Sequence, residues 1–163
     1  MSNDLATDYT ICAELASELG EFNEALDAYN HALAIRENLI SRTSGCDLAA
    51  YLARVFTNIG SVLIALEEGH QAITMFEKAI AIQEPLVKTH GLDDILGDLA
   101  RSKGYHGLML LNYGEVEQVE QAMAEIEFGM TTLQDEVSRT GRVDLKDALD
   151  WLVYDFSQFI NRG

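Results

Sequence analysis

The residue types that could carry out chemistry are few in this sequence of 163 residues, and they stand apart from one another. None of the four histidines is placed with a cysteine, aspartate or glutamate in a recognised metal-binding spacing, and no credible Cys–His pair is present. We therefore expect no metal site and no cysteine nucleophile. The residues concerned are His31, His70, His90, His106, Cys12 and Cys46.

Motifs for phosphate binding and acyl transfer are also missing. The segment 104–107, Gly-Tyr-His-Gly, lacks the spacing and the Lys and Ser/Thr of a phosphate-binding loop. No G-x-S-x-G elbow occurs in the sequence. We expect a protein that is not an enzyme, with no catalytic residue and no cofactor.

The charge of the chain narrows its choice of partner. With 27 acidic and 11 basic residues the formal net charge is −16, which disfavours binding to nucleic acid or to an anionic membrane surface. Residues 1–35 carry carboxylates but no Lys or Arg. This acidic stretch is either a solvated surface or a docking surface for a basic partner.

Signals for membrane insertion and export are not found. No apolar run approaches the ~20 residues of a membrane span, and the first residues lack the basic and apolar regions of a signal peptide. The two cysteines form neither a CxxC pair nor a disulfide framework. The cytoplasm is the expected compartment.

The sequence repeats itself at an offset of 47 residues. At this offset Ala25 falls on Ala72 and Tyr29 falls on Phe76, and the many further matches are mostly at apolar or small positions. A third copy is degenerate and is displaced by three residues, so that Ala72 matches Ala122. The matches indicate an array of three units.

Within each unit the apolar residues recur with the period of a helix. They follow the i, i+3, i+4, i+7 pattern of an amphipathic helix, and strand-like alternation is absent. Glycines at intervals of 22 to 27 residues indicate the helix ends: Gly20, Gly45, Gly69, Gly91, Gly114 and Gly141. We also expect Asp47, Asp93 and Asp144 to be N-caps. Seven helices are predicted, at about 4–19, 22–43, 47–67, 70–89, 93–112, 116–139 and 144–161.

The residues of the second unit carry a recognisable signature. They read Phe56-x2-Ile59-Gly60-x2-Leu63, followed by Ala72-x3-Phe76, Ala79 and Pro85. This pattern resembles the tetratricopeptide repeat. The standard unit has ~34 residues, so the present units resemble a long-repeat variant with about 13 additional residues between successive units. Pro85 lies in that extension, where it is expected to bend or end the fourth helix early.

The resemblance implies an all-α fold, an α-solenoid of three helix-turn-helix units. We place the units at about 4–46, 47–92 and 93–141, followed by a capping helix at 144–161, within a single domain of residues 1–163. A terminal helix of this kind covers the apolar face of the last repeat. An interface for another chain is the alternative role of that helix.

The resemblance also implies where a ligand binds, because the first helices of such units line a concave groove that takes peptides. Arg54 and Arg101 recur in that row, and an Arg can bind a carboxylate or a backbone carbonyl. Balancing of nearby acidic residues is the alternative role of the two arginines. The predicted groove residues are Arg54, Thr57, Asn58, Ser61, Arg101, Tyr105, Leu108, Asn112, Trp151 and Tyr154.

The function expected from these features is that of a non-enzymatic adaptor or scaffold that binds a protein or peptide. One alternative is a self-associating regulatory module, such as a homodimer. Another is a sensor with a small ligand or peptide in the groove.

Overall fold

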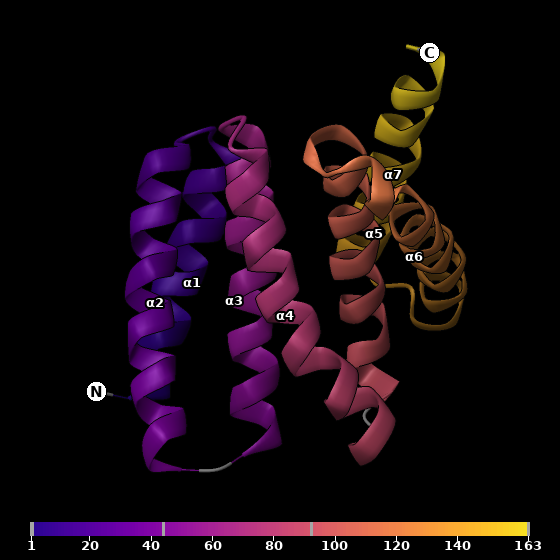
Figure 1. Ribbon diagram of the computed structural model, residues 1–163. Coiled ribbons are helices and arrows are strands. Elements are labelled where there is room, and N and C mark those ends of the chain that lie inside the picture. Colours follow the sequence, from indigo (N-terminus) through magenta and orange to yellow (C-terminus); the bar gives the residue numbers. More distant parts are fainter. Residues whose placement is uncertain (1, 44, 92, 163) are drawn as a thin grey trace. The chain divides into compact units, whose positions relative to one another are not determined.

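The computed structural model describes residues 2–43, 45–91 and 93–162, and these contain seven α-helices, two short 3₁₀-helices and no β-strand (Figure 1). The α-helices are α1 (Asn3–Glu18), α2 (Phe22–Arg42), α3 (Cys46–Ala65), α4 (Gly69–His90), α5 (Leu96–Tyr113), α6 (Val119–Thr140) and α7 (Val143–Asn161). The 3₁₀-helices η1 (Asp93–Ile95) and η2 (Val116–Gln118) directly precede α5 and α6. The all-α fold is confirmed, and each helix begins and ends within three residues of its predicted bounds.

The chain forms two compact structural units, which differ from the three predicted repeats. Unit 1 is Met1–Ile82 and unit 2 is Gln83–Gly163, and the division falls inside α4. Unit 1 contains α1, α2, α3 and most of α4, and unit 2 contains the end of α4 together with α5, α6 and α7. The division of a single domain into three repeats and a capping helix stays a prediction.

Glycines in the left-handed conformation end several helices, as predicted. Gly20 has φ +76° and Gly141 has φ +68°, values that an L-residue with a Cβ rarely adopts. The prediction for Gly69 was wrong, because this residue begins α4. At the preceding helix end the left-handed position is taken by Glu67, with φ +61°.

The predicted N-caps were wrong. The N-cap of α3 is Gly45 and that of α7 is Arg142, so Asp47 and Asp144 lie in the first helical turn instead. An acidic residue in that turn still interacts favourably with the positive end of the helix dipole. The N-cap of α5 is Ile95, because the 3₁₀-helix η1 occupies the positions where α5 was expected to begin.

The core of unit 1 is built where α4 packs on α3. A Cβ added to Gly60 would lie 2.6 Å from the Phe76 ring. The ring can therefore pack against the α3 backbone only because residue 60 has no side chain. Leu52 and Phe56 of α3 and Ala79 of α4 form a buried cluster beside this contact. The small residue at position 60 therefore has a packing reason, since it makes room for the large side chain of Phe76.

The core of unit 2 is built from α5, with α6 and α7 packed against it. A Cβ on Gly107 would lie 2.6 Å from the carbonyl oxygen of Ala122, so α5 and α6 are in backbone contact. Leu145 and Leu152 of α7 occupy the space that side chains at glycines 97 and 104 would fill. Both leucines are fully buried, which fits a terminal helix that covers the last repeat.

Pro85 does not end α4, contrary to one of its two predicted effects. The helix continues from Gly69 to His90 with Pro85 inside it. Proline has no N–H and so removes one hydrogen bond, but the turns on either side of it are retained.

The helix α3 comes closer to a membrane span than the sequence had indicated. It is the one helix among the described residues that is long and apolar enough, with a mean hydropathy of 1.5 over its most apolar stretch. Half of that stretch is buried inside the protein, and α2 and α4 pack against α3 within unit 1. Core helices meet the same criterion.

Candidate functional site

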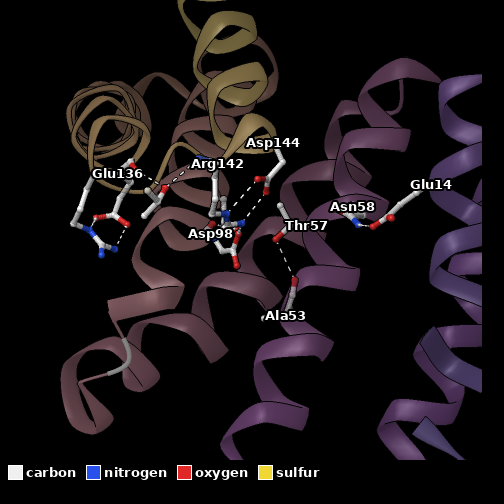
Figure 2. Close-up of polar contacts among 11 residues, drawn as sticks. Glu14, Ala53, Thr57, Asn58, Asp98, Glu136, Arg142 and Asp144 are labelled. Carbon is white, nitrogen blue, oxygen red and sulfur yellow. Dashed lines mark hydrogen bonds and ion pairs between the residues drawn. The ribbon is translucent and has the colours of Figure 1, made fainter. Parts of the chain in front are cut away.

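In unit 1 the predicted groove row lies on α3, next to α1. The Nδ2 of Asn58 donates a hydrogen bond to Oε1 of Glu14 on α1, over 3.4 Å, as Figure 2 shows. Arg54 lies one helical turn before Asn58 and is half-buried, and Ser61 donates from its hydroxyl to the carbonyl of Thr57. Arg54 and Asn58 therefore share one face with α1, which we call the α1–α3 face.

Thr57 was predicted as a groove residue and is not available as one. Its side chain is fully buried, and its hydroxyl donates to the carbonyl oxygen of Ala53 in the preceding turn (Figure 2). An inner helix of a helical array is covered on more than one side, so its solvent-accessible strip is narrower than the predicted row.

Arg36 was missed by the sequence reading, because it lies on a second helix, α2, rather than on a first helix. Its guanidinium reaches the α1–α3 face, where Nη1 donates to Oγ1 of Thr10 over 2.8 Å and Nη2 donates to Oγ1 of Thr7 over 3.4 Å. Each threonine hydroxyl donates to a carbonyl one turn earlier in α1, which leaves its lone pairs for the guanidinium. The guanidinium also lies 5.6 Å from the centre of the Tyr51 ring.

The guanidinium of Arg36 forms no direct ion pair in the described part of the chain. Its hydrogen bonds go to Thr10 and Thr7, and no described carboxylate lies within ion-pair distance, although the residue is only 3% exposed. Its Nε is buried without an acceptor. Burial lowers the pKa of Arg36 and nearby Arg54 lowers it further, whereas Tyr51 and Glu14 raise it. Since arginine stays protonated at physiological pH, the α1–α3 face holds a buried cation that has no direct ion pair in the described part of the chain and that Glu14 attracts from a longer distance.

In unit 2 the structure brings three predicted residues together. Tyr105 of α5 packs against Trp151 of α7, with 4.4 Å between ring centres and a 60° tilt. Arg101 lies one turn before Tyr105 and interacts electrostatically with its hydroxyl. Burial raises the pKa of Tyr105 to about 12, Arg101 lowers it, and the carboxylates at 147 and 155 raise it.

The availability of these unit 2 residues differs. Tyr105 and Leu108 are buried, which corrects their prediction as groove contacts, since the Trp151 ring covers Tyr105. Asn112 is exposed, but its Nδ2 donates to the carbonyl of Leu108 in its own helix, over 2.8 Å. Tyr154 is 60% exposed and remains accessible, with Arg101 and Trp151 half-buried.

An ion-pair network at the start of α7 was also missed. The Nη2 of Arg142 donates to Asp98 of α5 over 2.8 Å and to Asp144 over 2.7 Å, as Figure 2 shows. Asp98 is buried, so this network fixes the beginning of α7 on α5. The network links α7 to α5 through ion pairs, which indicates a structural role.

The histidines do not assemble a metal site in the described part of the chain. His106 is buried and its Nδ1 lies 2.5 Å from Oε2 of Glu125, in the contact between α5 and α6. His31 stacks on Tyr9. The side chain of His90 lies outside the described residues. Among those described, no group of three His, Cys, Asp or Glu residues could hold a metal ion.

A known family model matches both helix pairs of unit 1. Residues 9–39 and 53–85 match the family model described as "Tetratricopeptide repeat". The first match covers the α1–α2 pair and the second covers the α3–α4 pair. No curated protein matches the chain significantly.

Proposed function

The chain carries tetratricopeptide repeats, and from this premise we propose that it is a non-enzymatic adaptor that binds a peptide segment of a partner protein on the α1–α3 face. Tetratricopeptide repeats mediate contacts between proteins, which supports the general role. The single observation that carries the specific role is the buried guanidinium of Arg36, whose hydrogen bonds go to two neutral hydroxyls.

The chemistry of that face favours a carboxylate as the bound group. A buried cation is costly unless an anion or a set of strong acceptors accompanies it. A carboxylate that approached beside the exposed residues Thr7 and Tyr51 would meet Arg36 and Arg54. Asn58 offers a donor and an acceptor for the backbone of an extended peptide. We therefore propose a peptide with acidic residues flanked by apolar ones.

The test uses fluorescent peptides of about ten residues in which an Asp-Glu pair is flanked by Leu and Phe. A second set replaces the pair by Asn-Gln. Fluorescence anisotropy should show binding of the acidic set alone, weakened by salt. Arg36→Gln should weaken binding by about 1–3 kcal/mol, because a charge-assisted hydrogen bond is lost.

The matched control is Arg42→Gln, which removes the same charge from the exposed end of α2. Arg54→Gln provides a second variant on the proposed face, and circular dichroism checks that each variant is folded. Equal binding of the amide peptides, or equal effects of Arg36→Gln and Arg42→Gln, would refute the proposal.

The cytoplasm is the proposed compartment, which the free thiols of Cys12 and Cys46 support.

A further inference from the structure

Two adjoining apolar hollows lie between α6 and α7, within unit 2. The first has a volume of about 520 Å³ and is lined by residues that include Met123, Ile126, Met130 and Phe156. The second, of about 510 Å³, shares Met130. We call the combined surface the α6–α7 groove. Its large apolar lining residues are Met123, Ile126, Met130, Leu149, Val153 and Phe156.

The corresponding groove in unit 1 is occupied by a helix. At an offset of 97 residues, Leu33 of α2 corresponds to Met130, and Leu52 and Phe56 of α3 correspond to Leu149 and Val153. The same offset relates Met123, Ile126 and Phe156 to Leu26, Tyr29 and Ile59, in that order. The α6–α7 groove therefore corresponds to the α2–α3 surface of unit 1, on which the following helix α4 packs.

The helix that fills the unit 1 groove shows what the α6–α7 groove accepts. In unit 1, α4 places Met75, Ala79 and Ile82 against Leu33, Leu52 and Phe56. These three α4 residues have the i, i+4, i+7 spacing of one helix face, and the central one is small. An amphipathic helix with this spacing, about 10 Å between its first and last anchor, fits such a surface.

Two features argue against a second copy of this chain as the occupant. The position equivalent to Gly60 is Ser157, and a Cβ at Gly60 would lie 2.6 Å from the Phe76 ring. Helix α4 of another copy would meet that obstacle at Ser157. In addition, the groove lining includes Glu120, Glu127 and Asp150, of which Asp150 pairs with Lys146. A chain with net charge −16 is poorly suited to complement that acidic rim.

We infer that the α6–α7 groove binds an amphipathic helix of a different protein, with small and aliphatic residues at i, i+4 and i+7 and with Lys or Arg on the flanks. The apolar lining supplies the contact area and the acidic rim selects the basic flanks. This surface is separate from the α1–α3 face, so the inference does not depend on carboxylate recognition by Arg36.

The test uses a fluorescent peptide of about 15 residues with a Leu-x3-Ala-x2-Ile face and Lys at the flanking positions. A second peptide has the same face with Glu at the flanks, and a third has the Lys peptide's composition in scrambled order. Anisotropy with the full chain should show binding of the Lys peptide alone. Binding of the Lys and Glu peptides to the same extent, or no binding of the Lys peptide, would overturn the inference.

Variants locate the binding. Val153→Arg places a long side chain in the groove at a position that is 43% exposed, so the fold should persist. Val143→Arg is the matched control, because it makes the same change on the same helix, outside the groove lining, at a residue that is 69% exposed. We expect at least a tenfold weaker Kd for Val153→Arg and an unchanged Kd for Val143→Arg. Equal effects of the two would overturn the assignment to the groove.

Two further measurements separate the alternatives. Sedimentation of the wild-type chain should show a species that Val153→Arg does not change; a dimer that this variant dissociates would identify a second copy as the occupant and overturn the inference. Arg36→Gln should leave binding of the Lys peptide unchanged, and Val153→Arg should leave binding of the acidic peptides unchanged. The two binding proposals therefore fail separately.

Discussion

Gly104 of α5 and Gly129 of α6 face each other with no side chain between them. A Cβ on Gly129 would lie 2.7 Å from the Cα of Gly104 and 2.9 Å from the carbonyl oxygen of Ala100. Two backbones thus meet directly in the core of unit 2. Neither backbone can move aside as a flexible side chain could, so a methyl group cannot be accommodated there without a shift of a whole helix.

The first prediction tests this contact with Gly129→Ala. In an open helix position the change from Gly to Ala stabilises by about 1 kcal/mol, through helix propensity. Here we expect a loss of about 1–3 kcal/mol in the free energy of unfolding, because the added methyl group overpacks the contact. Urea unfolding followed by circular dichroism measures it, and a gain in stability would contradict the backbone contact.

The second prediction concerns the left-handed residue Glu67. It occupies the place in its repeat that Gly20 occupies one repeat earlier, and both have positive φ. The bonds agree, since Glu21 N–H donates to Ala16 and Glu68 N–H donates to Leu63, both over 2.8 Å. Glu67→Gly should raise the free energy of unfolding by about 1 kcal/mol, because glycine adopts this conformation without a steric cost.

Thermal unfolding measures the effect of Glu67→Gly. The reciprocal control is Gly20→Ala, which should lower the free energy of unfolding by a similar amount at the equivalent position. A lower Tm for Glu67→Gly would show that the backbone there is not left-handed in solution.

The third prediction concerns the ion pairs of Arg142. Replacement by Met should destabilise unit 2 by about 1–3 kcal/mol, because the buried carboxylate of Asp98 loses a charge-assisted hydrogen bond. Lys146→Met is the control, since Lys146 forms an exposed pair with Asp150 that is worth little. Urea unfolding of both variants gives the comparison. Similar small losses of unfolding free energy in the two variants would show that the Arg142 ion pairs stabilise the fold no more than an exposed pair does.

The fourth prediction concerns the pH dependence caused by Tyr105. Burial raises the pKa of this phenol from 10.0 to about 12, so the folded state holds the proton more tightly than the unfolded state. The contribution to stability is complete below pH 10 and is lost between pH 10 and 12, in total about 2–3 kcal/mol.

The measurement for Tyr105 is urea unfolding across that pH range, for the wild type and for Tyr105→Phe. The wild type should lose stability above pH 10 more steeply than the variant, because the variant has no phenol to ionise at this position. Parallel curves for the two proteins would show that Tyr105 ionises normally.

Much of the fold was accessible from the sequence because its determinants are local and repeated. The helical period and the glycines indicated where helices begin and end, and the offset of 47 residues paired Tyr29 with Phe76 as equivalent packing residues. Gly60 and Phe76 both belong to the repeat signature of the second unit, and the structure places the Phe76 ring against Gly60. Such patterns depend on neighbours within one or two turns, which the sequence displays directly.

The candidate site was accessible only in part. The resemblance to tetratricopeptide repeats put Arg101 and Tyr105 in one groove row, and periodicity indicates which residues share a face of a helix. It does not indicate which other helix covers that face, so the burial of Thr57 and the covering of Tyr105 by Trp151 were not foreseen. Arg36 escaped for the same reason, since its long side chain leaves α2 to reach Thr10 on α1. What the sequence determined by itself was the helices and their phase; the tertiary structure decided which charges are buried, because burial depends on contacts between residues far apart in the chain.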